Sequence, residues 1–306
     1  MAYTTIDDPT AYFQVKTYTG DGTTSNAQTF DGNTNMAPDM VWFKRRSGSA
    51  NHFLYDSIRG ANRSLVPNDV DAEATSGEQT TYLASFDSNG FTLGDDVNNV
   101  NASGETYVLW GWNTGASASS NTVGTENSTV SANTTAGFSI MTYAGTTAVD
   151  TYGHGLSQKP DMIIIKRRTL TGNWVVYHKS IGATKHLHLN TTDAEDTYQF
   201  MFNNTEPTNS LITLSDDGEV NKSGSNYVAY VFHSVKGYSK FSSYKGSGSS
   251  NGCYIDLGFR ASFIMIKKSS GTENWSIYDT KRNVNGTANT LPLNSDNADG
   301  KSGNTV

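Results

Sequence analysis

The chain has 306 residues, a net charge of −7, and a composition that is 35% hydrophobic, 11% aromatic and 17% charged. A negative charge without a basic tract argues against a nucleic-acid partner, because phosphate binding needs concentrated Lys and Arg. No stretch approaches the roughly 18 to 20 continuous apolar residues of a membrane span, so no membrane span is expected.

Glycine, threonine, serine and asparagine are frequent, and these residues favour turns and strand ends over helix interiors. Turn signals such as DSNG, SDDG and NKSG interrupt apolar runs at intervals typical of β-sandwiches. The single cysteine, Cys253, excludes an intrachain disulfide. The composition therefore predicts an all-β chain, with room for roughly two to three domains.

Residues 1–12, MAYTTIDDPTAY, come before the first repeated motif and have no later copy. We interpret them as an N-terminal docking peptide that attaches the chain to a larger particle. An ordinary frayed terminus is the alternative.

The first predicted β-sandwich module spans residues 13–112. It opens with FQVKTYTG, continues with PDMVWFKRR and closes with TYVLWGW. In the closing strand Val108, Trp110 and Trp112 alternate onto one face, which indicates a buried core. Residues 113–137 are rich in Ser, Thr, Asn and Gly, and we expect them to form a linker between the first two modules.

The second predicted β-sandwich module, residues 138–235, repeats the first. Its motifs are FSIMTYAG, PDMIIIKRR, NWVVYHK and NYVAYVF, in the same order. The run DMIIIK is apolar on both faces of a strand. This predicts a central strand that is covered by a second sheet or by a neighbouring module.

The third module, residues 236–306, carries SKFSSYKG, ASFIMIKKS and NWSIYDT but no copy of the closing strand. It is therefore predicted to be incomplete. Either the sequence is part of a longer chain, or a neighbouring subunit donates the strand. The predicted fold class is thus all-β, with tandem antiparallel β-sandwich modules in series, two complete and the third truncated.

Cations recur at the end of the second strand of each module, and they are the candidate interaction residues. They could hold an acidic glycan, or pair across modules with the short acidic motifs that begin at Asp71, Asp193 and Asn297. They could also simply keep an apolar strand soluble and protect its edge. In the first two modules these residues are Lys44, Arg45, Arg46, Lys166, Arg167 and Arg168.

No catalytic, cofactor or metal site is expected. His186 and His188 have a spacing compatible with metal binding, but their counterparts in the first module are Ser64 and Val66. No combination of Ser, His and acid suggests a triad, and 29 acidic residues offer no specific pair for glycoside hydrolysis.

The motifs HGLSQKPDMIIIKRR, NWVVYH, LHLN followed by DAE, and VNKSGSNYVAYVF together resemble a module of unknown function. That module recurs in tandem in proteins of tailed bacteriophages, especially marine ones. The resemblance implies a virion structural protein, usually assigned to a tail fibre or another appendage. It brings no known catalytic residues.

We therefore expect a non-enzymatic virion component, assembled in the host cytoplasm with other virion proteins. A homo-oligomer, commonly a trimer, would suit a tail fibre. Weak contacts with a host-surface glycan would then gain from several copies. The alternatives are a capsid decoration or cement protein and, third, a polysaccharide-degrading enzyme.

Overall fold

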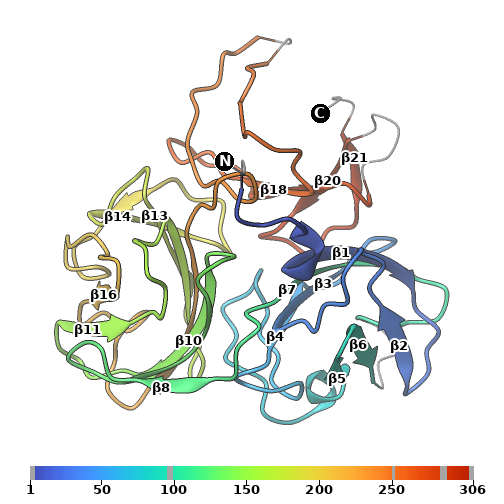
Figure 1. Ribbon diagram of the computed structural model, residues 1–306, viewed down its shortest axis with the longest axis horizontal. Helices are drawn as coiled ribbons and strands as arrows, with labels where there is room; N and C mark the ends of the chain where they lie inside the picture. Colours follow the sequence, from blue (N-terminus) through green and yellow to red (C-terminus); the bar gives the residue numbers. More distant parts are fainter. Residues whose placement is uncertain (1–3, 95–98, 250–251, 283–287, 303–306) are drawn as a thin grey trace.

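The computed structural model describes residues 4–94, 99–249, 252–282 and 288–302. It is built from antiparallel strands with two short 3-10 turns, η1 (Pro9–Ala11) and η2 (Glu78–Thr80). Three groups of strands, coloured blue to cyan, green to yellow and orange to red, stand around a common centre (Figure 1). The predicted all-β fold is confirmed.

The first module has two sheets. The larger has the strand order β1-β7-β3-β4 and the smaller has the order β2-β6-β5. The strands are β1 (Phe13–Thr19), β2 (Asn26–Thr29), β3 (Met40–Arg45), β4 (Phe53–Asp56), β5 (Leu83–Asp87), β6 (Gly90–Leu93) and β7 (Thr106–Trp112).

The strand β3 is apolar on both faces because it serves two cores. Val41 and Phe43 pack into the core between the two sheets of the first module. Met40 and Trp42 face the other way, into a core at the centre of the molecule. The central strand predicted from the sequence is thus covered on one side by a second sheet and on the other by neighbouring modules.

The second module has an eight-stranded sheet, with the order β15-β14-β13-β12-β17-β10-β9-β8, and the pair β11-β16. Its strands are β8 (Ser119–Asn121), β9 (Ser128–Asn133), β10 (Phe138–Ala144), β11 (Asp150–Gly153), β12 (Met162–Arg167), β13 (Trp174–His178), β14 (Lys185–His188), β15 (Asp196–Thr197), β16 (Leu211–Leu214) and β17 (Asn226–Phe232).

The segment 113–137, predicted from its composition to be a linker, contains two strands of the second module. It supplies β8 and β9, and β9 pairs with β10 along its length. Val130 is buried, and the buried Ser128 donates its hydroxyl to the Gly153 carbonyl at 2.7 Å. Small hydroxyl side chains that find backbone acceptors are compatible with a strand, so composition alone misassigned this segment.

The third module has one sheet in the described part of the chain, with the order β18-β19-β20-β21. Its strands are β18 (Phe263–Ile266), β19 (Ser276–Asp279), β20 (Ala288–Pro292) and β21 (Gly300–Ser302). Among the described residues no strand corresponds to β7 or β17, as the sequence predicts.

Equivalent contacts show that the modules are copies of one another. The Tyr18 hydroxyl donates to the Val100 carbonyl and the Tyr143 hydroxyl to the Val220 carbonyl, both at 2.7 Å. An asparagine side chain also accepts the backbone N–H of the Trp or His in the NW or NH motif of every module. These pairs are His52 with Asn68, Trp174 with Asn190 and Trp275 with Asn294, at 2.8, 2.9 and 2.9 Å.

The three modules are not arranged as a linear series; they close into a ring. One central core takes side chains from all three, including Trp110, Ile164 and Ile277. Each large sheet has a second apolar face, and a sheet must bury such a face against another layer. Packing the three faces together buries most of their apolar side chains, whereas a linear array would leave more of them in water.

Residues 4–12 lie on the body of the protein. Ile6 is buried, and Asp8 accepts the Thr10 N–H at the start of η1. The Tyr12 ring meets Tyr238, which follows the second module, at 6.1 Å between centroids. Residues 1–3 lie outside the described part, and the docking role of this segment remains a prediction.

Candidate functional site

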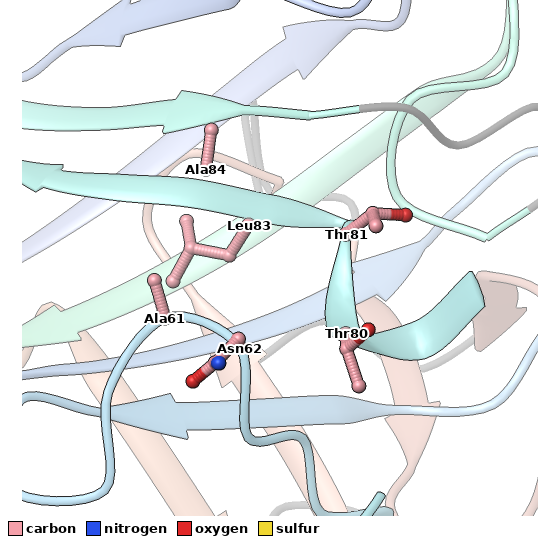
Figure 2. A pocket seen from close by; sticks show the side chains of 6 residues that line it. All are labelled: Ala61, Asn62, Thr80, Thr81, Leu83 and Ala84. Atoms are coloured by element: carbon pink, nitrogen blue, oxygen red, sulfur yellow. The ribbon is translucent and has the colours of Figure 1, made fainter. Parts of the chain in front are cut away.

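A hollow of about 460 Å³ lies on the first module, between the loop after β4 and the start of β5 (Figure 2). Figure 2 shows that short side chains line it, and these offer hydroxyl and amide groups but no titratable group. The lining can therefore form hydrogen bonds but cannot exchange protons. Its residues are Ala61, Asn62, Thr80, Thr81, Leu83 and Ala84.

The contacts between modules are the most regular polar feature of the molecule. In each module the first residue of the WVVYH, WSIYD or HFLYD motif donates its ring N–H to a backbone carbonyl of the preceding module in the ring. The first module makes this contact with the third, so the ring closes. The three contacts are Trp174 to Val66, Trp275 to His188 and His52 to Pro292, at 3.0, 2.9 and 3.4 Å.

A strand-end lysine makes a second contact of this kind at every interface. Its ammonium group donates to one carbonyl of the neighbouring module. Lys44 and Lys166 are fully buried, and burial lowers the pKa of each to about 8. The contacts are Lys166 to Val70, Lys267 to Thr192 and Lys44 to Asp296, at 2.8, 3.1 and 3.2 Å.

Arginines add ion pairs at two of the three interfaces. Arg168 meets Glu73 at 2.8 Å, and Arg46 meets Asp299 at the same distance. Burial acts to raise the pKa of Glu73, but the guanidinium groups around it hold that pKa below its ordinary value. At the third interface the equivalent position is Ser269, which has no charge.

The two remaining candidate cations are engaged within their own modules. Arg45 pairs with Glu105, and Arg167 donates to the Gly218 carbonyl at 3.0 Å. The structure thus brings Arg46 and Arg168 to the acidic motifs of other modules, as one of the sequence hypotheses proposed. All six strand-end cations have protein acceptors, so they offer no free cluster to an acidic glycan.

A buried ion pair in the first module completes its interface with the second. Asp56 and Arg59 are in contact at 2.5 Å, and both side chains are fully buried. Tyr230, from β17 of the second module, donates its hydroxyl to Asp56 at 2.7 Å. Burial raises the pKa of Tyr230 well above its ordinary value, so this hydroxyl remains a donor.

The third module repeats this arrangement toward the first. Asp279 pairs with Arg282 at 2.6 Å and accepts the Trp110 indole N–H at 3.0 Å. The second module departs from it, with His178 and Ile181 in the equivalent positions. Sequence reasoning missed these pairs, although the repeated spacing in DSIR and DTKR, against HKSI in the second module, could have indicated them.

The two histidines of β14 lie side by side, with ring centroids 4.8 Å apart. His188 meets Glu219 at 3.1 Å, and the buried His186 has no hydrogen-bond partner for Nδ1. Burial acts to raise the pKa of Glu219, but hydrogen bonds from His188 and Asn173 lower it to about 2. Within the described residues, no three His, Cys, Asp or Glu side chains are grouped to hold a metal ion.

The described part of the chain also contains no helix that is long and apolar enough to cross a membrane. Comparison with protein families shows that the chain belongs to the family described as Domain of unknown function (DUF7483), which matches residues 8–306. The match therefore includes all three modules as one domain. No curated protein and no solved structure matches the chain.

Proposed function

We propose that this member of a family of unknown function is a structural protein of a bacteriophage particle, in a tail fibre or another appendage. Two observations support the proposal. The repeated motifs resemble modules of tailed-phage proteins, and the recurring polar side chains hold modules together. The second observation carries the proposal. Polar residues that recur because they join the modules have a structural role, and no catalytic role is needed to explain them.

The ring would act as a rigid body that presents its variable loops. The insertion after β15 in the second module has the exposed aromatic rings Tyr198 and Phe200, with centroids 5.3 Å apart. The Tyr198 hydroxyl lies 3.3 Å from Asp217. Apolar ring faces beside a carboxylate are suited to stacking and hydrogen bonding with a sugar, so this pair is the proposed glycan contact.

Localisation on the particle tests the proposal. Purified phage that carries this chain with an epitope tag is labelled with gold-conjugated antibody and imaged by electron microscopy. The expected result is label at the tail, in copy numbers set by the symmetry of the appendage. Label spread over the head would instead assign the chain to capsid decoration, and particles without the chain would overturn the virion assignment.

Binding to host polysaccharide tests the glycan contact separately. Tyr198→Ala with Phe200→Ala should weaken binding about tenfold or more, because one stacked ring contributes roughly 0.5 to 1.5 kcal/mol. Tyr254→Ala is the matched control, since Tyr254 is 92% exposed and lies in another segment. Equal binding by all three proteins would remove Tyr198 and Phe200 from the proposal.

A further inference from the structure

The interface between the third and first modules closes the ring, and it differs from the other two in its connection along the chain. The first module continues directly into the second, and the second into the third, so these neighbours stay tethered if their contacts break. The third module lies beside the first in Figure 1, but the backbone connects them only through the second. This closing interface is therefore held by noncovalent contacts alone.

The closing interface also has a different ring donor. Tryptophan donates to the neighbouring carbonyl at the other two interfaces, whereas His52 does so here, over the longest of the three distances. The strand β3 compensates for the smaller ring, because Trp42 occupies the position that Ile164 has in the second module. A titratable ring thus replaces a neutral one at the interface that lacks a direct backbone connection.

Both ring nitrogens of His52 are engaged when the ring is closed. The Trp42 indole N–H donates to Nδ1 at 3.0 Å, so Nδ1 is an acceptor. The hydrogen of the neutral imidazole is then on Nε2, which faces the Pro292 carbonyl at 3.4 Å. A second proton would have to bind Nδ1, where it would oppose the indole N–H. Protonation of His52 is therefore incompatible with its hydrogen bond from Trp42.

The surroundings of His52 also oppose a positive charge. The side chain is fully buried, and burial lowers the pKa of the imidazole well below its ordinary value. The charged groups that act on it are both cations, Lys44 of the first module and Arg282 of the third. The carboxylates of Asp279 and Asp299 are engaged by Arg282, each at 2.6 Å. The other charged side chains of this interface are Arg46, Lys281, Asp31 and Asp296.

We propose that the closing interface opens in acid, and that protonation of His52 opens it. In the closed ring His52 is neutral, whereas in the open ring it meets water and can accept a proton. Below the ordinary histidine pKa of about 6.5, the open ring therefore binds one more proton than the closed ring. A fall in pH through this value favours the open ring, and a rise in pH above it restores the closed ring.

The other two interfaces have no titratable group at the equivalent contact. Trp174 and Trp275 donate through indole N–H groups, which do not titrate. His188 contributes to one of these contacts only through its backbone carbonyl. Its ring faces Glu219 at 3.1 Å, so a charged imidazole has an ion partner there. Acid should therefore act on one interface of the three.

Each interface has two backbone amides that report its opening. Ala50 and Asp299 donate across the closing interface, at 2.9 and 3.0 Å. Because these hydrogen bonds join different modules, their amides exchange with solvent when that interface opens. The equivalent amides are Glu73 and Gly172 between the first two modules, and Glu195 and Glu273 between the second and third.

Hydrogen exchange of the full chain, followed by NMR, tests the proposal at about pH 7.5 and about pH 5. After correction for the intrinsic exchange rates, the protection factors of Ala50 and Asp299 should fall about tenfold or more in acid, because one proton changes the opening constant by up to about tenfold per pH unit. Those of the other four amides should change less than about threefold. An equal loss at all three interfaces, or no loss at Ala50 and Asp299, would overturn the proposal.

Variants of His52 separate its protonation from other effects of acid. His52→Trp combined with Trp42→Ile copies the pair that the second module has, and the amides of Ala50 and Asp299 should then keep their protection in acid. His52→Phe serves if the double variant does not fold. It cannot titrate, so the protection of these two amides should be low but equal at both pH values. An acid response that persists without His52 would show that other groups cause it.

His154→Gln is the matched control. His154 is as deeply buried as His52, but its Nε2 lies 3.2 Å from the Thr208 carbonyl of its own module. This variant should keep the acid response of Ala50 and Asp299, and loss of the response would contradict the role of His52. All these measurements use the purified chain alone, so this inference and the proposed place on a phage particle can fail independently.

Discussion

The contact of the second module with the first differs from the contact of the third module with the second, although both follow one plan. Both contain a tryptophan N–H and a lysine ammonium that donate to backbone carbonyls. Only the first of them adds the pair of Arg168 with Glu73 and the Tyr230 hydroxyl on Asp56.

This difference shows which contacts define the ring and which reinforce it. The donors to backbone carbonyls occur at all three interfaces, so they fit the geometry of the repeat itself. The bond from an aromatic residue to a buried aspartate occurs only where a β7 or β17 strand supplies the donor. At the interface without such a strand, His178 and Ile181 replace the ion pair, which avoids a buried charge without its full set of partners.

The largest expected effect comes from breaking a buried ion pair. Asp56→Ala removes the nearer of the two carboxylates that pair with the buried Arg59, leaving Glu73 at 3.0 Å, and it removes the acceptor of the Tyr230 hydroxyl. We expect a loss of about 3 to 5 kcal/mol in the free energy of unfolding, measured with guanidinium chloride. His178→Ala, the equivalent change in the second module, should cost only about 1 kcal/mol. Similar losses for the two variants would contradict the distinction between the interfaces.

The second effect is a pH dependence from the buried lysines. Below pH 8 Lys44 and Lys166 are protonated in both the folded and the unfolded states. In the folded protein the pKa of these lysines is about 8, and in the unfolded chain it has the ordinary value of 10.5. Between these two pH values the unfolded chain binds more protons than the folded protein, so the free energy of unfolding rises with pH.

We expect a gain of about 1 to 2 kcal/mol per lysine between roughly pH 8 and 9.5, measured by denaturant titration at each pH. Lys166→Met should remove its share of the gain. Lys267→Met is the matched control at the other interface, where the side chain is less buried and the gain should be smaller. A stability that stays flat from pH 8 to 9.5 would contradict the burial of charged lysines.

A smaller effect is expected for the partly exposed ion pair. The side chain of Arg168 is 22% exposed and that of Glu73 is 5% exposed. Arg168→Ala should therefore cost about 1 to 2 kcal/mol, because screening by water reduces the value of the pair. Arg45→Ala, which breaks a solvent-screened pair within one module, should cost less than Arg168→Ala and serves as the control for a lost surface arginine.

The smallest expected effect is a gain in stability. Ser269→Arg would place a guanidinium group where Arg46 and Arg168 stand at the other two interfaces, near Glu195. Because Glu195 already pairs with Lys185 at 2.5 Å, we expect only about 0.5 kcal/mol of added stability. A rise in the thermal midpoint for Ser269→Arg but not for Ser269→Gln would show that charge at this interface is sufficient.

Much of the fold could be predicted from the repeats. Their alternating apolar residues specify strands, and the doubly apolar DMIIIK run indicates a strand covered on both faces, as Ile163 and Ile164 confirm by packing into different cores. The strands of residues 113–137 could not be predicted, because Ser and Thr are equally common in loops. Their hydroxyls fit a sheet only once Gly153 and other acceptors are in place.

The candidate site shows the same division. The sequence indicated that the strand-end cations recur and named the acidic motifs as partners, but it could not choose among pairing, glycan binding and solubility. The contacts of the two lysines, of Arg46 and of Arg168 join residues of different modules, such as Lys44 with Asp296, far apart along the chain. Local sequence patterns do not show which residues from distant parts of the chain come into contact.

By itself the sequence determined the strand unit and its copies, because strand formation follows from local alternation and turn residues. The tertiary structure alone decided that the units close into a ring, since closure depends on burying three apolar faces together. That burial sets which carbonyls of the neighbouring modules the lysines reach.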